Sequence, residues 1–150
     1  MSSESNISIV RLEVEDILKD YSRIEKQISK ALVFSSGEWT TLQIIQGAIS
    51  DPSNMHVWDI YDSGDLVATA STRVIQYNNF VSLHIVTLGG YTNNKLTEWT
   101  NEFTEMIKQH QTIDCVEFTG RRALVKRLEK AGWKERYVTM RLSMKDDFHV

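Results

Sequence analysis

The side chain best suited to move a proton near neutral pH in this sequence is His84, because an ordinary imidazole titrates close to that pH. His84 stands in an apolar run, residues 80–88, whose pattern predicts a strand. A lone histidine in such a strand is ordinarily a structural residue, so both a catalytic and a structural interpretation of His84 stay open. No set of serine, histidine and aspartate can be singled out around the four histidines.

The composition limits the class of protein. A chain of 150 residues has the size of one domain, with residues 1–6 expected to be flexible. The single cysteine, Cys115, has no histidine beside it and no second cysteine to pair with, so we expect neither a disulfide, a zinc site nor a nucleophilic thiol. No signal-peptide pattern or long apolar run is present, and the net charge is −3. These features predict one soluble cytoplasmic domain.

The first part of the chain predicts one strand followed by two helices. Apolar and polar residues alternate over residues 7–12, and residues 13–32 carry apolar residues at helical spacing. A second helix is expected to begin around residues 36–39, to bury Leu42 with its other apolar residues, and to stop before Pro52, which cannot continue a helix.

The rest of the chain predicts a three-stranded meander and then alternating helices and strands. The meander covers residues 55–61, 66–77 and 80–88, and its last strand ends at Gly89 and Gly90. A helix starting at Asn93 or Asn94, a strand over residues 113–118, a helix over residues 121–131 and a final strand over residues 133–144 follow. The order β-α-α-β-β-β-α-β-α-β predicts an α/β (α+β) fold with a mixed, mostly antiparallel sheet flanked by about four helices.

That order, over roughly residues 7–144, resembles the GNAT superfamily of N-acetyltransferases. The most specific stretch is Leu-Glu-Lys-Ala-Gly-Trp at residues 128–133, which is similar to the family's closing segment of a helix, a glycine and an aromatic residue. Gly132 stands where a left-handed helix cap is usual. A run beginning Gly120-Arg121-Arg122 is also similar to small GNAT-related proteins encoded by bacteriophages.

The resemblance implies an acetyl-CoA site, but the family's pyrophosphate loop, V-x-P-x-x-R-x-x-G-x-G/A-x-x-L, is largely lost. With Trp99 at the final apolar position, only Val86 keeps the family's residue; the altered positions are Leu88, Tyr91, Asn94 and Leu96. Gly89 and Gly90 could still form a nest of N–H groups for phosphates, or simply a turn. An atypical cofactor site would consist of Leu88, Gly89, Gly90, Tyr91, Asn93 and Asn94.

The resemblance also implies a base for the substrate amine and an acid for the CoA thiolate. The family's acidic tyrosine is replaced by Leu128, and its asparagine by Arg121. Tyr137 could act as the acid only if the final strand passes close to the cleft. His84, and less favourably Glu38, are the candidate bases.

Five basic residues fall on the predicted helix over residues 121–131: Arg121, Arg122, Lys126, Arg127 and Lys130. They could receive the 3′-phosphate of CoA, nucleic acid or an acidic protein, although a solvated helix face is the ordinary interpretation. The acidic balance of the chain argues against general binding of nucleic acid.

Two functions follow as expectations. The preferred one is a GNAT-like protein without catalysis and without a cofactor, acting through protein contacts as a bacteriophage accessory or virion-associated protein. The alternative is an acetyl-CoA-dependent N-acetyltransferase with an atypical cofactor loop. We expect protein partners rather than a membrane or nucleic acid, no metal, and location in the cytoplasm, or in a host cytoplasm or virion for a phage protein. Formation of homo-oligomers stays open.

Overall fold

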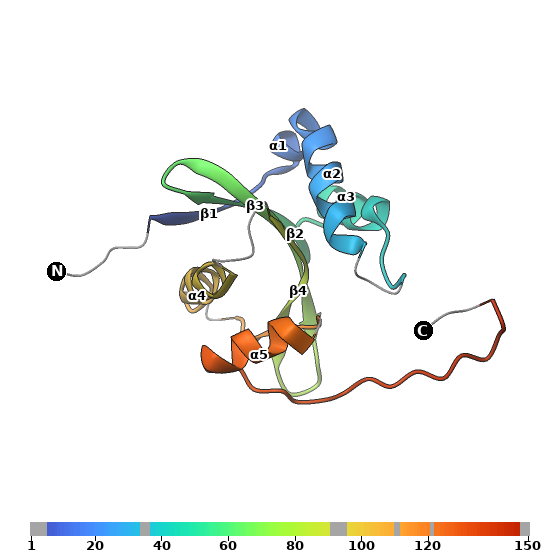
Figure 1. The fold of residues 1–150 in the computed structure, drawn as a ribbon. Helices are drawn as coiled ribbons and strands as arrows, with labels where there is room; N and C mark the ends of the chain where they lie inside the picture. Colours follow the sequence, from blue (N-terminus) through green and yellow to red (C-terminus); the bar gives the residue numbers. More distant parts are fainter. Residues whose placement is uncertain (1–5, 34–36, 91–95, 110–111, 121, 148–150) are drawn as a thin grey trace. The chain divides into compact units, whose positions relative to one another are not determined.

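The structure is a computed structural model that describes residues 6–33, 37–90, 96–109, 112–120 and 122–147. The chain divides into two compact units, Met1–Thr119 and Gly120–Val150. The first unit holds a sheet and four helices, and the second holds one helix followed by a segment without regular structure (Figure 1). The single domain predicted from length stays a prediction.

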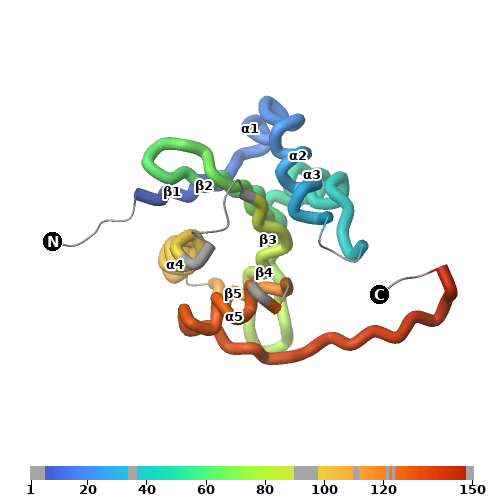
Figure 2. Tube along the Cα trace, in the orientation of Figure 1, coloured from blue at the N-terminus to red at the C-terminus, as the bar shows by residue number. Residues whose placement is uncertain are grey.

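One five-stranded sheet organises the first unit, in the spatial order β1 (Ile7–Arg11), β2 (Met55–Asp62), β3 (Asp65–Gln76), β4 (Val81–Gly90) and β5 (Cys115–Phe118). The first three pairings are antiparallel and β4 pairs with β5 in parallel (Figure 2). The predicted meander is therefore confirmed. Ser63 and Gly64 both have positive φ in the two-residue turn between β2 and β3, the geometry that tight hairpins need.

Three helices pack their apolar residues against one face of this sheet: α1 (Val14–Lys19), α2 (Tyr21–Leu32) and α3 (Thr41–Ser50). Their shared core consists of Ile17, Ile24, Ile28, Ile44, Ile45, Ala48 and Val57. Because successive strand residues point to opposite faces, Trp58 faces away from this core. There it meets Phe103 of α4 (Leu96–Ile107), with ring centroids 5.2 Å apart in an edge-to-face contact.

The helices differ from the prediction in two places. The helix predicted over residues 13–32 is interrupted at Asp20, whose φ of −117° and ψ of 30° are not helical, so two helices form and Leu18 is exposed. The next helix begins only at Thr41, because Thr40 and Gln43 form a capping box that fixes the start. With that start, Leu42 faces solvent and its predicted burial is wrong.

The second unit contains α5 (Arg122–Lys130), which ends as predicted at Gly132 with φ of +97°. The amide of Trp133 donates to the carbonyl of Leu128, and that of Gly132 to Glu129, the two hydrogen bonds of a Schellman cap. The final strand predicted over residues 133–144 is wrong for this structure, because no strand is assigned to those described residues. Alternation of apolar residues creates a strand only where a neighbouring strand supplies the hydrogen bonds.

Candidate functional site

Three charged or titratable side chains lie in a row across neighbouring strands of the first unit. Arg73 on β3 is opposite His84 on β4, and His84 is opposite Glu117 on β5. Residues opposite one another point to the same face of a sheet, with Cβ atoms about 5 Å apart. The ring of Trp39, over which Arg73 lies, packs on the core of α1, α2 and α3, which identifies the face. We call Arg73, His84 and Glu117 the polar row.

Each member of the polar row is half-buried and presents a buried polar atom that has no hydrogen-bond partner among the described residues. These atoms are Arg73 Nε, His84 Nδ1 and Glu117 Oε1. In His84 and Glu117, the second polar atom of the side chain does have a partner. His84 Nε2 lies 3.2 Å from Thr119 Oγ1, and Glu117 Oε2 accepts a hydrogen bond of 3.4 Å from the Tyr77 hydroxyl. Buried polar atoms in proteins nearly always have a partner, so three in one row mark a place where a polar ligand or water belongs.

The surroundings of His84 favour its neutral form. Burial lowers the pKa of His84 below its ordinary value, the positive charge of Arg73 lowers it further, and the carboxylate of Glu117 opposes both effects. When Nε2–H is donated to Thr119, Nδ1 keeps its lone pair and can accept a proton. The arrangement therefore supplies a neutral imidazole at pH 7, with a carboxylate beside it that stabilises the charged form once a proton has arrived.

Strand β5 pairs with only part of β4 beside the polar row. The pairing of β4 with β5 covers Ser82 to Ile85 on β4 and ends where Ile85 is opposite Phe118. Strand β4 continues to Gly90, and within the described part of the chain residues 87–90 pair with β3 alone. Alternate residues of such a half-paired strand direct N–H and C=O groups away from β3. The polar row thus adjoins an open strand edge.

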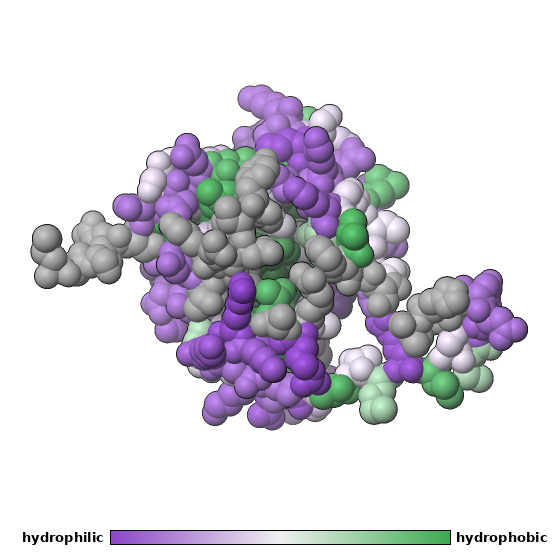
Figure 3. All heavy atoms as spheres, viewed as in Figure 1, coloured by the Kyte–Doolittle hydropathy of each residue, from purple (hydrophilic) through white to green (hydrophobic). Residues whose placement is uncertain are grey.

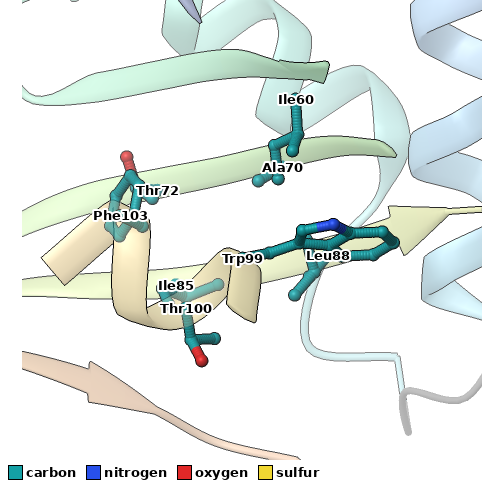
Figure 4. Close-up of a pocket in the computed structure, with 8 residues that line it drawn as sticks. All are labelled: Ile60, Ala70, Thr72, Ile85, Leu88, Trp99, Thr100 and Phe103. Carbon is teal, nitrogen blue, oxygen red and sulfur yellow. The ribbon is translucent and has the colours of Figure 1, made fainter. Parts of the chain in front are cut away.

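A small apolar pocket lies on the other face of β4, between the sheet and α4 (Figure 4). Leu88 and Ile85 from β4 meet Trp99 and Phe103 from α4, and β2 and β3 complete the lining. Trp99 is buried, and its indole Nε1 has no hydrogen-bond partner among the described residues. This pocket has an apolar lining, so its contents would be selected by shape rather than by charge.

The structure describes only part of the predicted cofactor loop. Strand β4 includes both glycines, and Gly90, its last residue, is opposite Ala68. A Cβ atom on Gly89 would stand 2.9 Å from the carbonyl oxygen of Gln27 and 3.3 Å from Ala31 Cβ, so Gly89 permits the close approach of α2 to the sheet. Leu88 lines the apolar pocket. The predictions for Tyr91, Asn93 and Asn94 concern residues outside the described ranges.

The remaining predicted site residues belong to other parts of the chain. Tyr137 is in the second unit, within the segment that has no regular structure, so its predicted role as the acid stays a prediction. Of the basic cluster, Arg122, Lys126, Arg127 and Lys130 are exposed on α5, where Figure 3 shows hydrophilic side chains gathered, and Arg121 lies outside the described residues. Glu38 precedes α3 in the first unit and is exposed.

Sequence reasoning found His84 but missed Arg73, Glu117 and Thr119. None of them stands in a recognisable motif, and 33 residues separate His84 from Glu117 along the chain, counted as 117 minus 84. The usable signal was the strand register, since a meander followed by a parallel strand brings charged residues of the three strands onto one face. That register depends on a β-bulge between β3 and β4, which sequence patterns do not locate.

Solved structures show which fold this is. A possible acetyltransferase from Clostridium difficile superimposes with a TM-score of 0.67 at 14% identity, covering 95% of this chain and 99% of that one. A predicted acetyltransferase from Clostridium acetobutylicum, solved with acetyl-CoA, gives 0.65 at 12% identity with the same coverages. Glucosamine-6-phosphate N-acetyltransferase from Arabidopsis thaliana gives 0.59 at 16% identity, covering 93% and 99%.

The chain therefore has the fold of the GNAT acetyltransferases, as the order of elements predicted. No protein-family model matches the sequence, and no curated protein matches it. Within the described residues, no helix is long and apolar enough to cross a membrane. The same residues contain no group of three or more histidine, cysteine, aspartate or glutamate side chains that could hold a metal ion.

Proposed function

We propose that this protein is an N-acyltransferase that takes an acetyl group from acetyl-CoA and passes it to an amine. The observation that carries the proposal is the position of His84, with its lowered pKa and unbonded Nδ1, beside the edge of β4 that β5 leaves open. An enzyme of this fold needs a proton acceptor next to the acyl donor, and both requirements meet at this point.

The open edge of β4 suits the extended arm of acetyl-CoA. That arm contains amide groups, and an extended ligand with amides can add to a strand edge through main-chain hydrogen bonds. Residues 86–90 of β4 would hold the arm. The geometry of Gly89 does not support the phosphate nest considered for it, because the space beside its Cα is occupied by α2. When bound, acetyl-CoA supplies the acetyl group as a thioester.

The polar row would handle the proton of the acceptor. An amine is protonated at neutral pH and must lose that proton before its lone pair can attack, and His84 Nδ1 can take the proton. The imidazolium formed would be stabilised by Glu117 across the strands, while Thr119 keeps the ring in place. Tyr137 stays the candidate that the sequence offers for the acid that protonates the departing CoA thiolate.

A second candidate is the non-catalytic protein that acts through contacts, as a bacteriophage accessory or virion-associated protein. One observation favours a contact role: five large apolar side chains are exposed in the second unit, at Tyr137, Val138, Met140, Leu142 and Met144. Figure 3 shows hydrophobic and hydrophilic side chains mixed along this segment. Such an exposed apolar surface suits a protein partner or a second copy of the chain. The basic residues of α5 directly precede this segment in the sequence.

The first experiment is a thermal-shift titration of the full chain with acetyl-CoA and with CoA. A ligand at one hundred times its dissociation constant stabilises a protein by about 2.7 kcal/mol, which gives a visible rise in Tm. We expect that rise, together with release of CoA thiol in the presence of an amine.

His84→Gln should lower the rate by about 100-fold or more while leaving the shift intact. His56→Gln is the matched control and should retain the rate, because His56 hydrogen-bonds Thr72 and Ser53 away from the polar row. Absence of any shift at millimolar ligand would favour the contact protein instead.

A further inference from the structure

Arg73 forms no ion pair in the described part of the first unit, and the carboxylate of Glu117 lies two strands away, beyond His84. The ion pairs found there join Arg23 to Asp20 and Asp59, and Lys108 to Glu105. Arg73 is half-buried, and its Nε is among the buried atoms without a hydrogen-bond partner. Burial of a charged group is unfavourable unless another group compensates it, so a site of this kind favours an anion.

The aromatic ring of Trp39 holds the guanidinium of Arg73 in position. The Cζ atom of Arg73 lies 5.0 Å from the centroid of the Trp39 ring, within the range of a cation–π contact. Trp39 itself packs against the core of α1, α2 and α3 and is therefore anchored. A guanidinium held against an aromatic ring still has N–H donors along its edge, and that planar edge binds carboxylate and phosphate oxygens well.

The position of Arg73 relates this anion site to the proposed chemistry. Arg73 is directly opposite His84 across the antiparallel pair of β3 and β4. Side chains opposite one another are separated by about 5 Å at Cβ, so one small molecule can reach both. An anionic group at Arg73 would place an amine of the same molecule near His84.

We propose that Arg73 and Trp39 form an oxyanion subsite that selects acceptor amines carrying a carboxylate or a phosphate. This inference rests on the proposed acyltransferase function for its meaning, but the subsite can be tested by binding alone. Carboxylate and phosphate both present oxygen atoms that a guanidinium binds. Probes that carry one or the other distinguish which of the two the subsite prefers.

The test uses two matched pairs of amines with the full chain in the absence of acetyl-CoA. β-Alanine is compared with its carboxamide, and phosphoethanolamine with ethanolamine, by calorimetry and thermal shift. We expect the charged member of at least one pair to bind about 10-fold or more tightly than its neutral partner, and the pair that responds identifies the oxyanion. Arg73→Gln should abolish the difference, Arg73→Lys should keep part of it, and Trp39→Leu should weaken it. Lys108→Gln is the control and should leave it unchanged, because this exposed lysine pairs with Glu105 of α4, which covers the other face of the sheet.

The possible outcomes separate the subsite from the proposed function. No difference within either pair, including no binding by any of the four amines, overturns the subsite even where acetyl-CoA raises Tm. A difference that persists in Arg73→Gln also overturns it, as long as this variant unfolds at the same temperature as Arg73→Lys. A difference that depends on Arg73, in a protein that does not respond to acetyl-CoA, supports the subsite and counts against the acyltransferase.

Discussion

The guanidinium of Arg23 on α2 binds the carboxylate of Asp59 on β2 with two hydrogen bonds, of 2.8 Å from Nη2 and 3.1 Å from Nη1. The carboxylate is almost fully buried, and the hydroxyl of Thr69 on β3 also donates to it at 3.0 Å. Arg23 reaches Asp20 as well, at the interruption between α1 and α2. A single side chain therefore ties the helical layer to the centre of the sheet, and the charge on Asp59 is compensated only while Arg23 is present.

Removal of Arg23 should be costly for stability. We expect Arg23→Ala to lower the free energy of unfolding by roughly 3 kcal/mol, because it leaves a buried carboxylate without its partner. The pair of replacements Arg23→Met and Asp59→Leu should recover most of the loss, since two apolar groups leave no uncompensated charge. Urea denaturation measures both. A double variant as unstable as the sum of its single variants would contradict this account.

Replacement of Gly89 tests whether it serves packing or phosphate binding. The added methyl group of Gly89→Ala would meet the main chain of α2 at Gln27, which cannot move without shifting the helix. We expect a loss of about 1–3 kcal/mol in unfolding free energy, with acetyl-CoA binding by the folded protein retained. Chemical denaturation and thermal shift with the ligand give the two readings. Unchanged stability with lost acetyl-CoA binding would restore the phosphate-loop interpretation.

The lowered pKa of His84 should make stability depend on pH. In the unfolded chain the imidazole titrates near pH 6.5, while the folded protein keeps His84 neutral to a lower pH. The unfolded state therefore binds more protons between these two pKa values, so stability is greatest above about pH 6.5, falls as the pH drops below that value and levels off below the folded pKa. His84→Gln should flatten this fall in denaturation curves recorded from pH 7 to pH 5.

His56 contributes in the same direction, because burial and the charge of Arg11 lower its pKa as well. The profile of His84→Gln should consequently keep a residual slope, and His56→Gln should remove a different part of it. Identical profiles for wild type and His84→Gln would show that His84 titrates normally in the folded state.

Gly132 should matter through its backbone. Its φ of +97° lies in the region that side chains avoid, and no atom stands within 4 Å of an added Cβ, so strain alone acts there. We expect Gly132→Ala to destabilise the end of α5 by about 1 kcal/mol, within the range found for left-handed residues. Hydrogen exchange at the amide of Trp133, which bonds Leu128, reports the change. Gly132→Asn should be milder, since asparagine tolerates this conformation better.

The candidate site shows where sequence reasoning stops. His84 was recognisable because its type and its apolar strand are both visible in the sequence. Arg73 and Glu117 look like ordinary surface charges until the register is known, and the open edge of β4 depends on where β5 stops pairing. A pair of glycines at residues 89 and 90 suggested a phosphate loop, although the contact with α2 explains Gly89 better.

The sequence by itself determined most of the elements in the described residues, because apolar periodicity and capping residues act locally. The Schellman cap at Gly132, the meander and the order of elements that gives the GNAT fold all follow from neighbouring residues. Only the tertiary structure decided which side chains meet, since strand register, the β-bulge and the approach of α2 depend on residues far apart in the chain. The same reason explains residues 133–144, whose alternating pattern needs a neighbouring strand before it can become one.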